Sequence, residues 1–226
     1  TSGPVYFGAT VVLLFVLGLF FVESRLKWAL LTTAILTIAL AWGKNFMGLT
    51  DFFLDYIPGY NKFRAVTILL SITGLVFPVL GFMFIRQLDR NPEIVLKKAK
   101  LFLGVSGGLA LILISFSAVP QVFFNFLSTQ ENEIFSNISQ GENGTAVLQY
   151  VSALQDARAE LFVADALRSL VFVILLTAAL WFFASGKIKQ NVFIVVLAVL
   201  ILADLFPIAK RYVNNEKEKG RYLAWQ

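Results

Sequence analysis

The sequence predicts an all-α fold, a polytopic transmembrane helical bundle of about six spans with one amphipathic helix at the membrane interface. Hydrophobic residues make up 58% of the 226 residues and charged residues only 15%, whereas a soluble domain carries about 25% charged residues. The mean hydropathy of +0.77 agrees with this composition. The apolar residues also gather in runs close to the roughly 17–25 residues that cross a bilayer as a helix.

Six apolar runs have the length of a span or nearly so. They are 5–22, 28–43, 65–85, 101–119, 169–186 and 192–208. The second run is short, and Pro78 should kink the third. Gly104 and Gly108 in the fourth have GxxxG spacing, which favours close helix packing over a ligand role.

The Lys and Arg residues of the short loops predict the orientation. Loops 23–27, 86–100 and 186–191 carry two, five and two of them, so this face should be cytoplasmic. The opposite, extracytoplasmic face then receives the N-terminus, loops 44–64 and 120–168, and the C-terminal residues 209–226. The five cations after residue 208 argue the other way, but long segments are translocated largely regardless of charge.

The long segment 120–168 divides into two parts. Residues 128–144 are polar and rich in Asn, Glu and Gly, which predicts a loop. From residue 145 apolar residues recur with helical spacing, at Leu148, Val151, Leu154, Leu161 and Ala164. This pattern predicts an amphipathic helix over 145–166 that lies on the membrane and leads into the fifth span.

The composition also limits the chemistry. The chain has no Cys and no His, which excludes thiolate nucleophiles, disulfides, the usual zinc sites and imidazole acid–base catalysis. Catalysis would have to use Asp, Glu, Lys, Arg, Tyr or a bound cation. The net charge of +5 bears on orientation in the membrane, and no nucleic-acid partner is expected.

The stretch from Trp42 to Ala65, WGKNFMGLTDFFLDYIPGYNKFRA, combines acids, cations and aromatic residues between two apolar runs. Such a segment either lies on the membrane interface or folds into a pocket, and polar groups at that depth mark a substrate path. If Thr50 caps a short helix, Asp51 and Asp55 share one face of it. A carboxylate there could act as a general base or hold a divalent cation with a phosphate. The alternative is that Asp51 simply lies in the first turn of a helix, where a negative charge is favourable.

Several cations are candidates for binding a phosphate. Lys62 and Arg64 follow the turn at Pro58 and Gly59, and Arg binds phosphate through two parallel hydrogen bonds. The alternative for this pair is interfacial anchoring. Further candidates at the same membrane face are Arg158, Arg168, Lys210 and Arg211.

Asp204 is the acid that falls inside an apolar run. Because a buried carboxylate is costly in a membrane, its simplest role is structural or coupling, through a pairing with Lys210 or Arg211. Three separate segments thus supply acids and cations at one membrane surface, which suggests an anionic, membrane-embedded substrate.

The stretches WGKNFMGLTDFFLDYIPGYNKFRAV, ARAELFVADALRS and ILADLFPIAKRYVN resemble bacterial YfhO-like membrane proteins, along essentially the whole chain. That family belongs to the C-type glycosyltransferase superfamily of the bacterial cytoplasmic (inner) membrane. The resemblance implies transfer of a sugar from a polyprenyl-phosphate donor to an envelope glycan or protein acceptor. It implies that Asp51, Asp55, Lys62 and Arg64 bind carrier phosphate or acceptor. It also implies a longer protein, with the main base before Thr1, so that this segment can be inactive alone.

The sequence is also compatible with two other functions. A transporter or lipid flippase would need charges at mid-bilayer and broken helices at matching places in two halves. A non-catalytic subunit of a larger membrane complex would pack the loop 44–64 against a partner chain and leave no open cavity there. In each case membrane lipids are expected partners.

Overall fold

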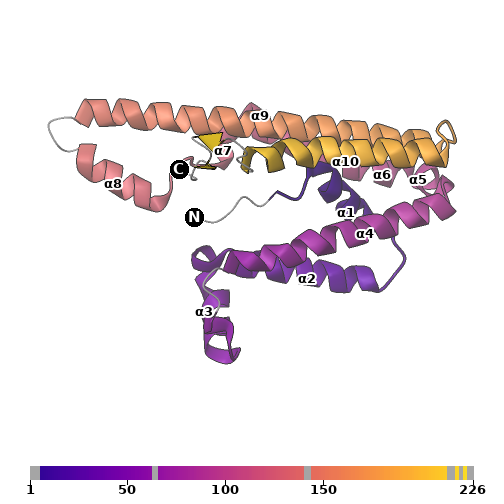
Figure 1. Ribbon diagram of the computed structural model, residues 1–226, viewed down its shortest axis with the longest axis horizontal. Helices are drawn as coiled ribbons and strands as arrows, with labels where there is room; N and C mark the ends of the chain where they lie inside the picture. Colours follow the sequence, from indigo (N-terminus) through magenta and orange to yellow (C-terminus); the bar gives the residue numbers. More distant parts are fainter. Residues whose placement is uncertain (1–5, 63–65, 140–143, 213–216, 219–220, 223–226) are drawn as a thin grey trace.

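The computed structural model describes residues 6–62, 66–139, 144–212, 217–218 and 221–222. Figure 1 shows an elongated molecule built from helices that run mostly along its long axis. The helices are α1 (Ala9–Phe21), α2 (Leu26–Ala41), α3 (Met47–Tyr56), α4 (Leu70–Arg90), α5 (Glu93–Lys97), α6 (Ala99–Ala118), α7 (Pro120–Phe123), α8 (Thr129–Ser139), α9 (Gly144–Ala184) and α10 (Gln190–Tyr212). Short 3-10 turns cover Gly43–Phe46, Tyr60–Lys62 and Val66–Leu69, and a two-residue antiparallel pair joins β1 (Lys217–Glu218) to β2 (Arg221–Tyr222).

The helical composition agrees with a membrane bundle. Within the described residues, α6, α9, α10 and the segment Thr67–Arg90 are long and apolar enough to cross a membrane, and α1 and α2 are shorter apolar helices. Each of the six predicted runs therefore coincides with a helix, although the first helix begins at Ala9, four residues later than the run, and α4 continues through Pro78.

The loops of the bundle lie at its two ends as the charge pattern predicts. In Figure 1 the connections α1–α2, α4–α5–α6 and α9–α10 are at the right-hand end, and these contain the three basic loops. Helices α3 and α8 are towards the left-hand end, and the start of α1 faces it. We call this left-hand end the polar end, because it carries the predicted site residues.

Helix α9 differs from the prediction. The predicted interfacial helix 145–166 and the predicted span 169–186 form one helix of 41 residues, about 62 Å long at 1.5 Å per residue. The reason is that no Gly or Pro lies between Gly144 and Gly186 to end it. Its first half continues the axis of its apolar second half, and α8 lies alongside that first half (Figure 1).

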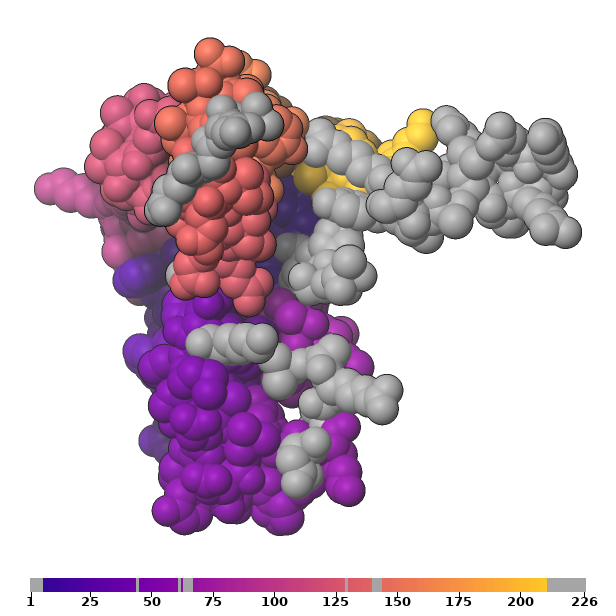
Figure 2. Space-filling view, turned by 90° about the vertical axis from the view of Figure 1, so that its left-hand side faces the viewer, coloured from indigo at the N-terminus to yellow at the C-terminus, as the bar shows by residue number. Residues whose placement is uncertain are grey.

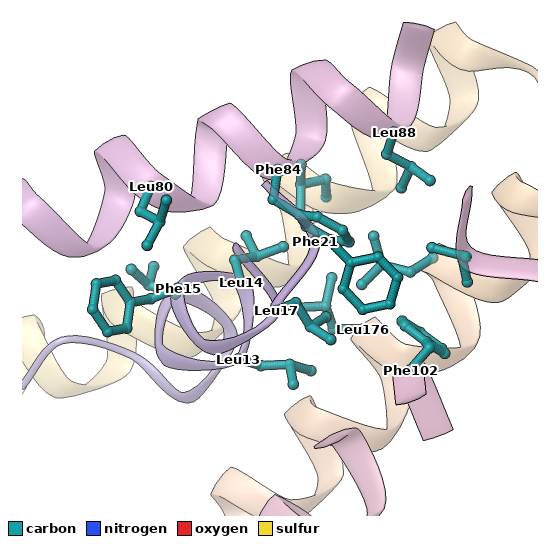
Figure 3. Packing of buried hydrophobic residues seen from close by; sticks show 14 of the residues in the cluster. Leu13, Leu14, Phe15, Leu17, Phe21, Leu80, Phe84, Leu88, Phe102 and Leu176 are labelled. Atoms are coloured by element: carbon teal, nitrogen blue, oxygen red, sulfur yellow. The ribbon is translucent and has the colours of Figure 1, made fainter. Parts of the chain in front are cut away.

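Helix α1 occupies the centre of the bundle and contacts α4, α9, α6, α10 and α2. It is apolar on all sides, as expected of a helix that is buried all round. Figure 3 shows Leu13, Leu17 and Phe21 packed between side chains of α4, α6 and α9. Because lipid is as apolar as these side chains, close packing holds this core together more than exclusion of water does.

The close helix contact uses other glycines than the sequence predicts. A Cβ atom on Gly18 of α1 would lie 2.7 Å from Leu80 Cγ and 2.9 Å from the Leu80 carbonyl oxygen. Gly81 lets α4 approach Leu14 in the same way, with 3.0 Å to the Leu14 Cβ. Around Gly104 and Gly108, in contrast, a Cβ atom would meet nothing within 4 Å, so the described chain does not pack helices at the GxxxG motif.

Candidate functional site

Asp204 on α10 has no exposed surface and is fully surrounded by partners. Tyr6 donates a hydrogen bond from its hydroxyl to Oδ1 at 2.7 Å. The backbone N–H and the hydroxyl of Thr10 both donate to Oδ2, at 3.0 and 2.9 Å. Arg168 on α9 lies 3.6 Å from Oδ1 and also donates to the Asp204 carbonyl oxygen. One carboxylate thereby joins three segments at the polar end.

The start of α1 explains why the acid is accommodated there. The first N–H groups of a helix have no partner within it, and a negative charge is favourable beside them. Gly8, with φ +85°, lets the backbone before α1 approach the Asp204 carboxylate. A Cβ atom at this position would lie 3.1 Å from Asp204 Oδ2. Asp204 therefore caps α1 from another helix.

Arg168 is held within the same cluster. Its guanidinium lies over the rings of Tyr6 and Phe172, at 5.8 and 5.5 Å from their centroids, and cations are attracted to such ring faces. The pairing of Asp204 with Lys210 or Arg211 expected from the sequence is wrong for Lys210, which is exposed, and the Arg211 side chain lies outside the described residues. No role was predicted for Tyr6 and Thr10, although two polar residues four positions apart at the start of an apolar run are a signal for one.

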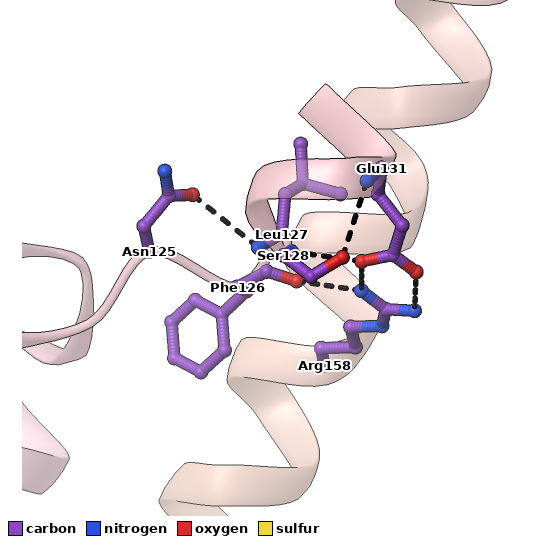
Figure 4. Close-up of polar contacts among 6 residues, drawn as sticks. All are labelled: Asn125, Phe126, Leu127, Ser128, Glu131 and Arg158. Carbon is purple, nitrogen blue, oxygen red and sulfur yellow. Dashed lines mark hydrogen bonds and ion pairs between the residues drawn. The ribbon is translucent and has the colours of Figure 1, made fainter. Parts of the chain in front are cut away.

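A second polar cluster fixes α8 to α9 (Figure 4). Arg158 donates from Nη2 to Glu131 Oε1 at 2.8 Å and from Nη1 to Oε2 at 3.0 Å. Nη1 also donates to the Phe126 carbonyl oxygen at 2.7 Å. Arg158 therefore binds the chain that leads into α8, and this leaves it poorly placed for the phosphate role predicted for it.

Ser128 and Glu131 form a capping box at the start of α8. The Ser128 N–H donates to Glu131 Oε2 at 2.8 Å, and the Glu131 N–H donates to Ser128 Oγ at 3.1 Å. The bonds from Arg158 and then from Ser128 lower the pKa of Glu131 to about 2. The predicted loop 128–144 is thus wrong over Thr129–Ser139, because the sequence S-x-x-E at 128–131 starts a helix.

A polar pocket of about 460 Å³ lies where the chain around α7 meets α9. We call it the α7–α9 pocket, and it is lined by Gln121, Phe124, Asn125, Phe126, Ser152, Gln155 and Asp156. Two aromatic lining residues pack on Phe162 of α9, with centroid distances of 4.8 Å for Phe124 and 5.8 Å for Phe126. Amide, hydroxyl and carboxylate groups therefore share the pocket with aromatic rings.

The chemistry of this lining favours a neutral polyhydroxyl ligand. Amides both donate and accept hydrogen bonds, and an ionised carboxylate accepts several. Asp156 is the charged member of the lining, so an anion placed directly against it would be repelled. No local sequence pattern indicates the pocket, because Gln121, Asn125 and Gln155 are ordinary polar residues that only the fold brings together.

Helix α3 carries Asp51 and Asp55 on one exposed face, as the spacing predicts. Thr50 is not its cap, because α3 begins at Met47 and the Thr50 hydroxyl donates back to the Gly43 carbonyl oxygen at 3.0 Å. Gly59 adopts φ +87° in the following turn, a conformation that favours glycine.

The remaining predicted residues fall around this turn. Lys62 is exposed, Pro58 lies in the turn, and Arg64 is outside the described residues. Within the described part of the chain, no group of three or more acids lies where it could hold a metal ion.

The predicted site residues therefore share one end of the molecule without forming one pocket. Figure 2 views that end, with α8 and the start of α9 in its upper half and α3 in its lower half. Arg158 and Arg168 are ten positions apart on α9, about 15 Å along the helix. The structure thus contains a buried cluster at Asp204, the α7–α9 pocket and the separate helix α3. It also contains the ion pair between Glu131 and Arg158, which we call the clamp.

A scan against models of protein families found no match, and searches among curated proteins and solved structures found none either. The chemistry of this end of the molecule therefore has to be judged from its own geometry.

Proposed function

We propose that the chain is the membrane region of an enzyme that transfers a sugar from a polyprenyl-phosphate carrier to a glycan or protein of the bacterial cell envelope. The reaction would take place at the extracytoplasmic face of the inner membrane. The observation that carries the proposal is the α7–α9 pocket, whose lining suits sugar hydroxyls. The resemblance of the stretch Trp42–Ala65 to YfhO-like proteins supports the same activity.

The place of the pocket fits a lipid-linked substrate. Helix α7 directly follows α6, a helix long and apolar enough to span, and its Val122 and Phe123 are exposed. Asp156 lies twelve positions before Arg168 on α9, about 18 Å towards the polar end. A sugar bound there would sit beyond the apolar part of α9, while an attached polyprenyl chain could remain in the lipid.

The cations divide into two groups in this proposal. Arg158 and Arg168 are engaged by Glu131 and Asp204, so they would stabilise the fold around the site. Lys62 and Lys210 have exposed side chains at the polar end and are the better candidates to bind the carrier phosphate as point charges.

The reaction itself requires little of the protein beyond positioning and charge. The bond between the sugar carbon and the phosphate oxygen breaks, the acceptor oxygen bonds to that carbon, and its proton passes to a carboxylate. Positive charge beside the departing phosphate stabilises the transition state. Asp156 is the carboxylate that the pocket itself supplies, to hold the sugar or to accept the proton, whereas Asp51 and Asp55 are exposed on the separate helix α3.

A transporter is less well supported. The described helices α4, α6, α9 and α10 are continuous, whereas transporter sites typically use helices broken near the bilayer midplane. The acid within an apolar helix, Asp204, is closed in by Tyr6, Thr10 and Arg168. It is therefore not open to a transported substrate.

Sugar transfer by membranes that contain the full-length gene product tests the proposal. The donors would be radiolabelled polyprenyl-phosphate sugars, and wild type would be compared with Gln155→Ala/Asp156→Asn. Each lost hydrogen bond to a ligand removes about 0.5–1.5 kcal/mol, so we expect a loss of about tenfold in transfer. Glu160→Gln is the matched control, because Glu160 is exposed on α9 outside the pocket.

The outcomes are distinct. Transfer by wild type and by Glu160→Gln, with the pocket variant reduced, would support both the activity and the site. Undiminished transfer by the pocket variant would contradict the site. Absence of transfer by the wild type from every donor would contradict the activity and favour a non-catalytic subunit.

A further inference from the structure

Helix α3 leaves the bundle sideways. In Figure 1 it runs across the direction of α2 and α4 and projects away from the other helices. Its main contacts are with α2 and with the two 3-10 turns that flank it. A ten-residue helix in this position has most of its surface uncovered by the described chain.

The uncovered surface has two chemically different faces. Leu49, Phe52, Phe53 and Tyr56 follow the spacing i, i+3, i+4, i+7, which places them in one stripe. Phe52 is 51% exposed and Tyr56 71% exposed, and their ring centroids are 5.0 Å apart. At 100° per residue, Asp51 and Asp55 lie about 150° and 110° from the centre of this stripe. Both are exposed, and the exposed Leu54 lies next to them. We call the first four residues the aromatic stripe.

An uncovered aromatic stripe of this kind marks a contact with a membrane or another protein. Three features favour lipid. The neighbouring helices have exposed apolar side chains of their own, such as Ile35 on α2 and Leu75 on α4, and α3 directly contacts α2. Trp42, at the end of α2, is 60% exposed, and Trp and Tyr are enriched at membrane–water interfaces. The helix also lies across the spanning direction, as interfacial helices do.

We propose that α3 lies in the plane of the membrane at headgroup depth, with the aromatic stripe in lipid and with Asp51 and Asp55 facing water. The helix would thus anchor the polar end at a fixed depth. It would keep both carboxylates out of the lipid, where a charge is costly. This inference concerns the contact between α3 and lipid and does not depend on the proposed sugar transfer.

Site-directed spin labelling tests this arrangement directly, since the chain has no Cys to remove. Single variants Phe52→Cys, Tyr56→Cys, Asp51→Cys and Asp55→Cys would be labelled with a nitroxide in liposomes. The relaxation of each label would then be measured separately with oxygen, which concentrates in lipid, and with a water-soluble nickel chelate. Leu75→Cys on α4, 71% exposed, serves as the lipid-facing reference and reports whether each preparation is inserted.

We expect the ratio of oxygen to nickel accessibility to reverse between the two faces of α3. Labels at 52 and 56 should resemble the label at 75, and labels at 51 and 55 should be relaxed mainly by nickel. High nickel accessibility at all four positions would overturn the proposal by placing α3 in water. Low accessibility to both reagents at 52 and 56 would also overturn it, because a protein partner would then cover the stripe.

Discussion

Asp204 and the α3 pair, Asp51 and Asp55, are acids at the same end of the molecule in opposite surroundings. Asp204 is fully buried and accepts hydrogen bonds from Tyr6 and Thr10 beside the Arg168 guanidinium. Asp51 and Asp55 are exposed on a helix that contacts little of the bundle. The acid within an apolar run of this chain therefore joins helices, while the acids in the aromatic-rich loop are accessible to solvent or to a ligand.

Replacement of Asp204 should have the largest effect. Asp204→Ala removes the cap of α1 and leaves the partly buried Arg168 charge without its partner. Loss of one member of a buried ion pair costs about 3–5 kcal/mol. Unfolding in detergent micelles would measure the change in the free energy of unfolding. Arg168→Leu in the Asp204→Ala background should cost less than the sum of the single changes, and a loss below about 1 kcal/mol for Asp204→Ala would contradict this role.

Gly18 and Gly104 differ in the same way, because Gly18 is in close contact with another helix and Gly104 is not. Gly18→Ala should cost about 1–3 kcal/mol, because the new methyl group would press on the Leu80 backbone. Gly104→Ala meets open space and should stay within about 0.5 kcal/mol of the wild type. Paired thermal denaturation of the two variants checks this, and equal losses would show that α6 is covered at Gly104.

The clamp between Glu131 and Arg158 should respond to acid. The pKa of Glu131 is about 2, below its ordinary value of 4.5, because the folded state favours the ionised carboxylate. The stabilisation is therefore complete above pH 4.5 and is lost as the pH falls through about 2. Spin labels at residues 134 and 153 should show a distance distribution that broadens over this range. In Glu131→Gln the distribution should be independent of pH, and a wild-type distribution unchanged at pH 2 would show that other contacts hold α8.

The smallest effect is expected for the acids of α3. Asp51→Asn and Asp55→Asn should each change the free energy of unfolding by no more than about 0.5 kcal/mol, as is usual for exposed positions. The same micelle assay used for Asp204→Ala would measure it. A loss above about 1 kcal/mol would place these carboxylates in a buried network and remove the contrast with Asp204.

The sequence predicted the elements of the fold better than their contacts. Apolar length located the four long apolar helices and the two shorter ones, α1 and α2, and the basic loops were correctly grouped at one end. The amphipathic pattern correctly predicted the start of α9. It did not predict that this helix continues into the apolar run 169–186, which it does because no Gly or Pro occurs from residue 145 to residue 185. Helix α8 was missed although Ser128 and Glu131 have capping-box spacing, because the polar composition favoured a loop.

Contacts between distant segments could not be read from local patterns. Asp204 was recognised as an unusual acid, but its partners lie 198, 194 and 36 residues away along the chain. GxxxG spacing at Gly104 indicated packing, yet the close contact is made by Gly18 and Gly81, which have no such motif. The α7–α9 pocket likewise combines residues from two segments about 30 positions apart, so only the fold reveals it.

The most direct test of the proposed function is to locate a bound donor. A polyprenyl-phosphate sugar with a photoactivatable diazirine on the sugar ring would be crosslinked to the full-length protein in membranes, and the labelled peptides would be identified by mass spectrometry. We predict label within residues 121–126 and 152–156, competed by unlabelled donor and reduced in Gln155→Ala/Asp156→Asn. Competed label confined to α3, or to the loop between α9 and α10, would contradict the assignment of the α7–α9 pocket as the sugar site.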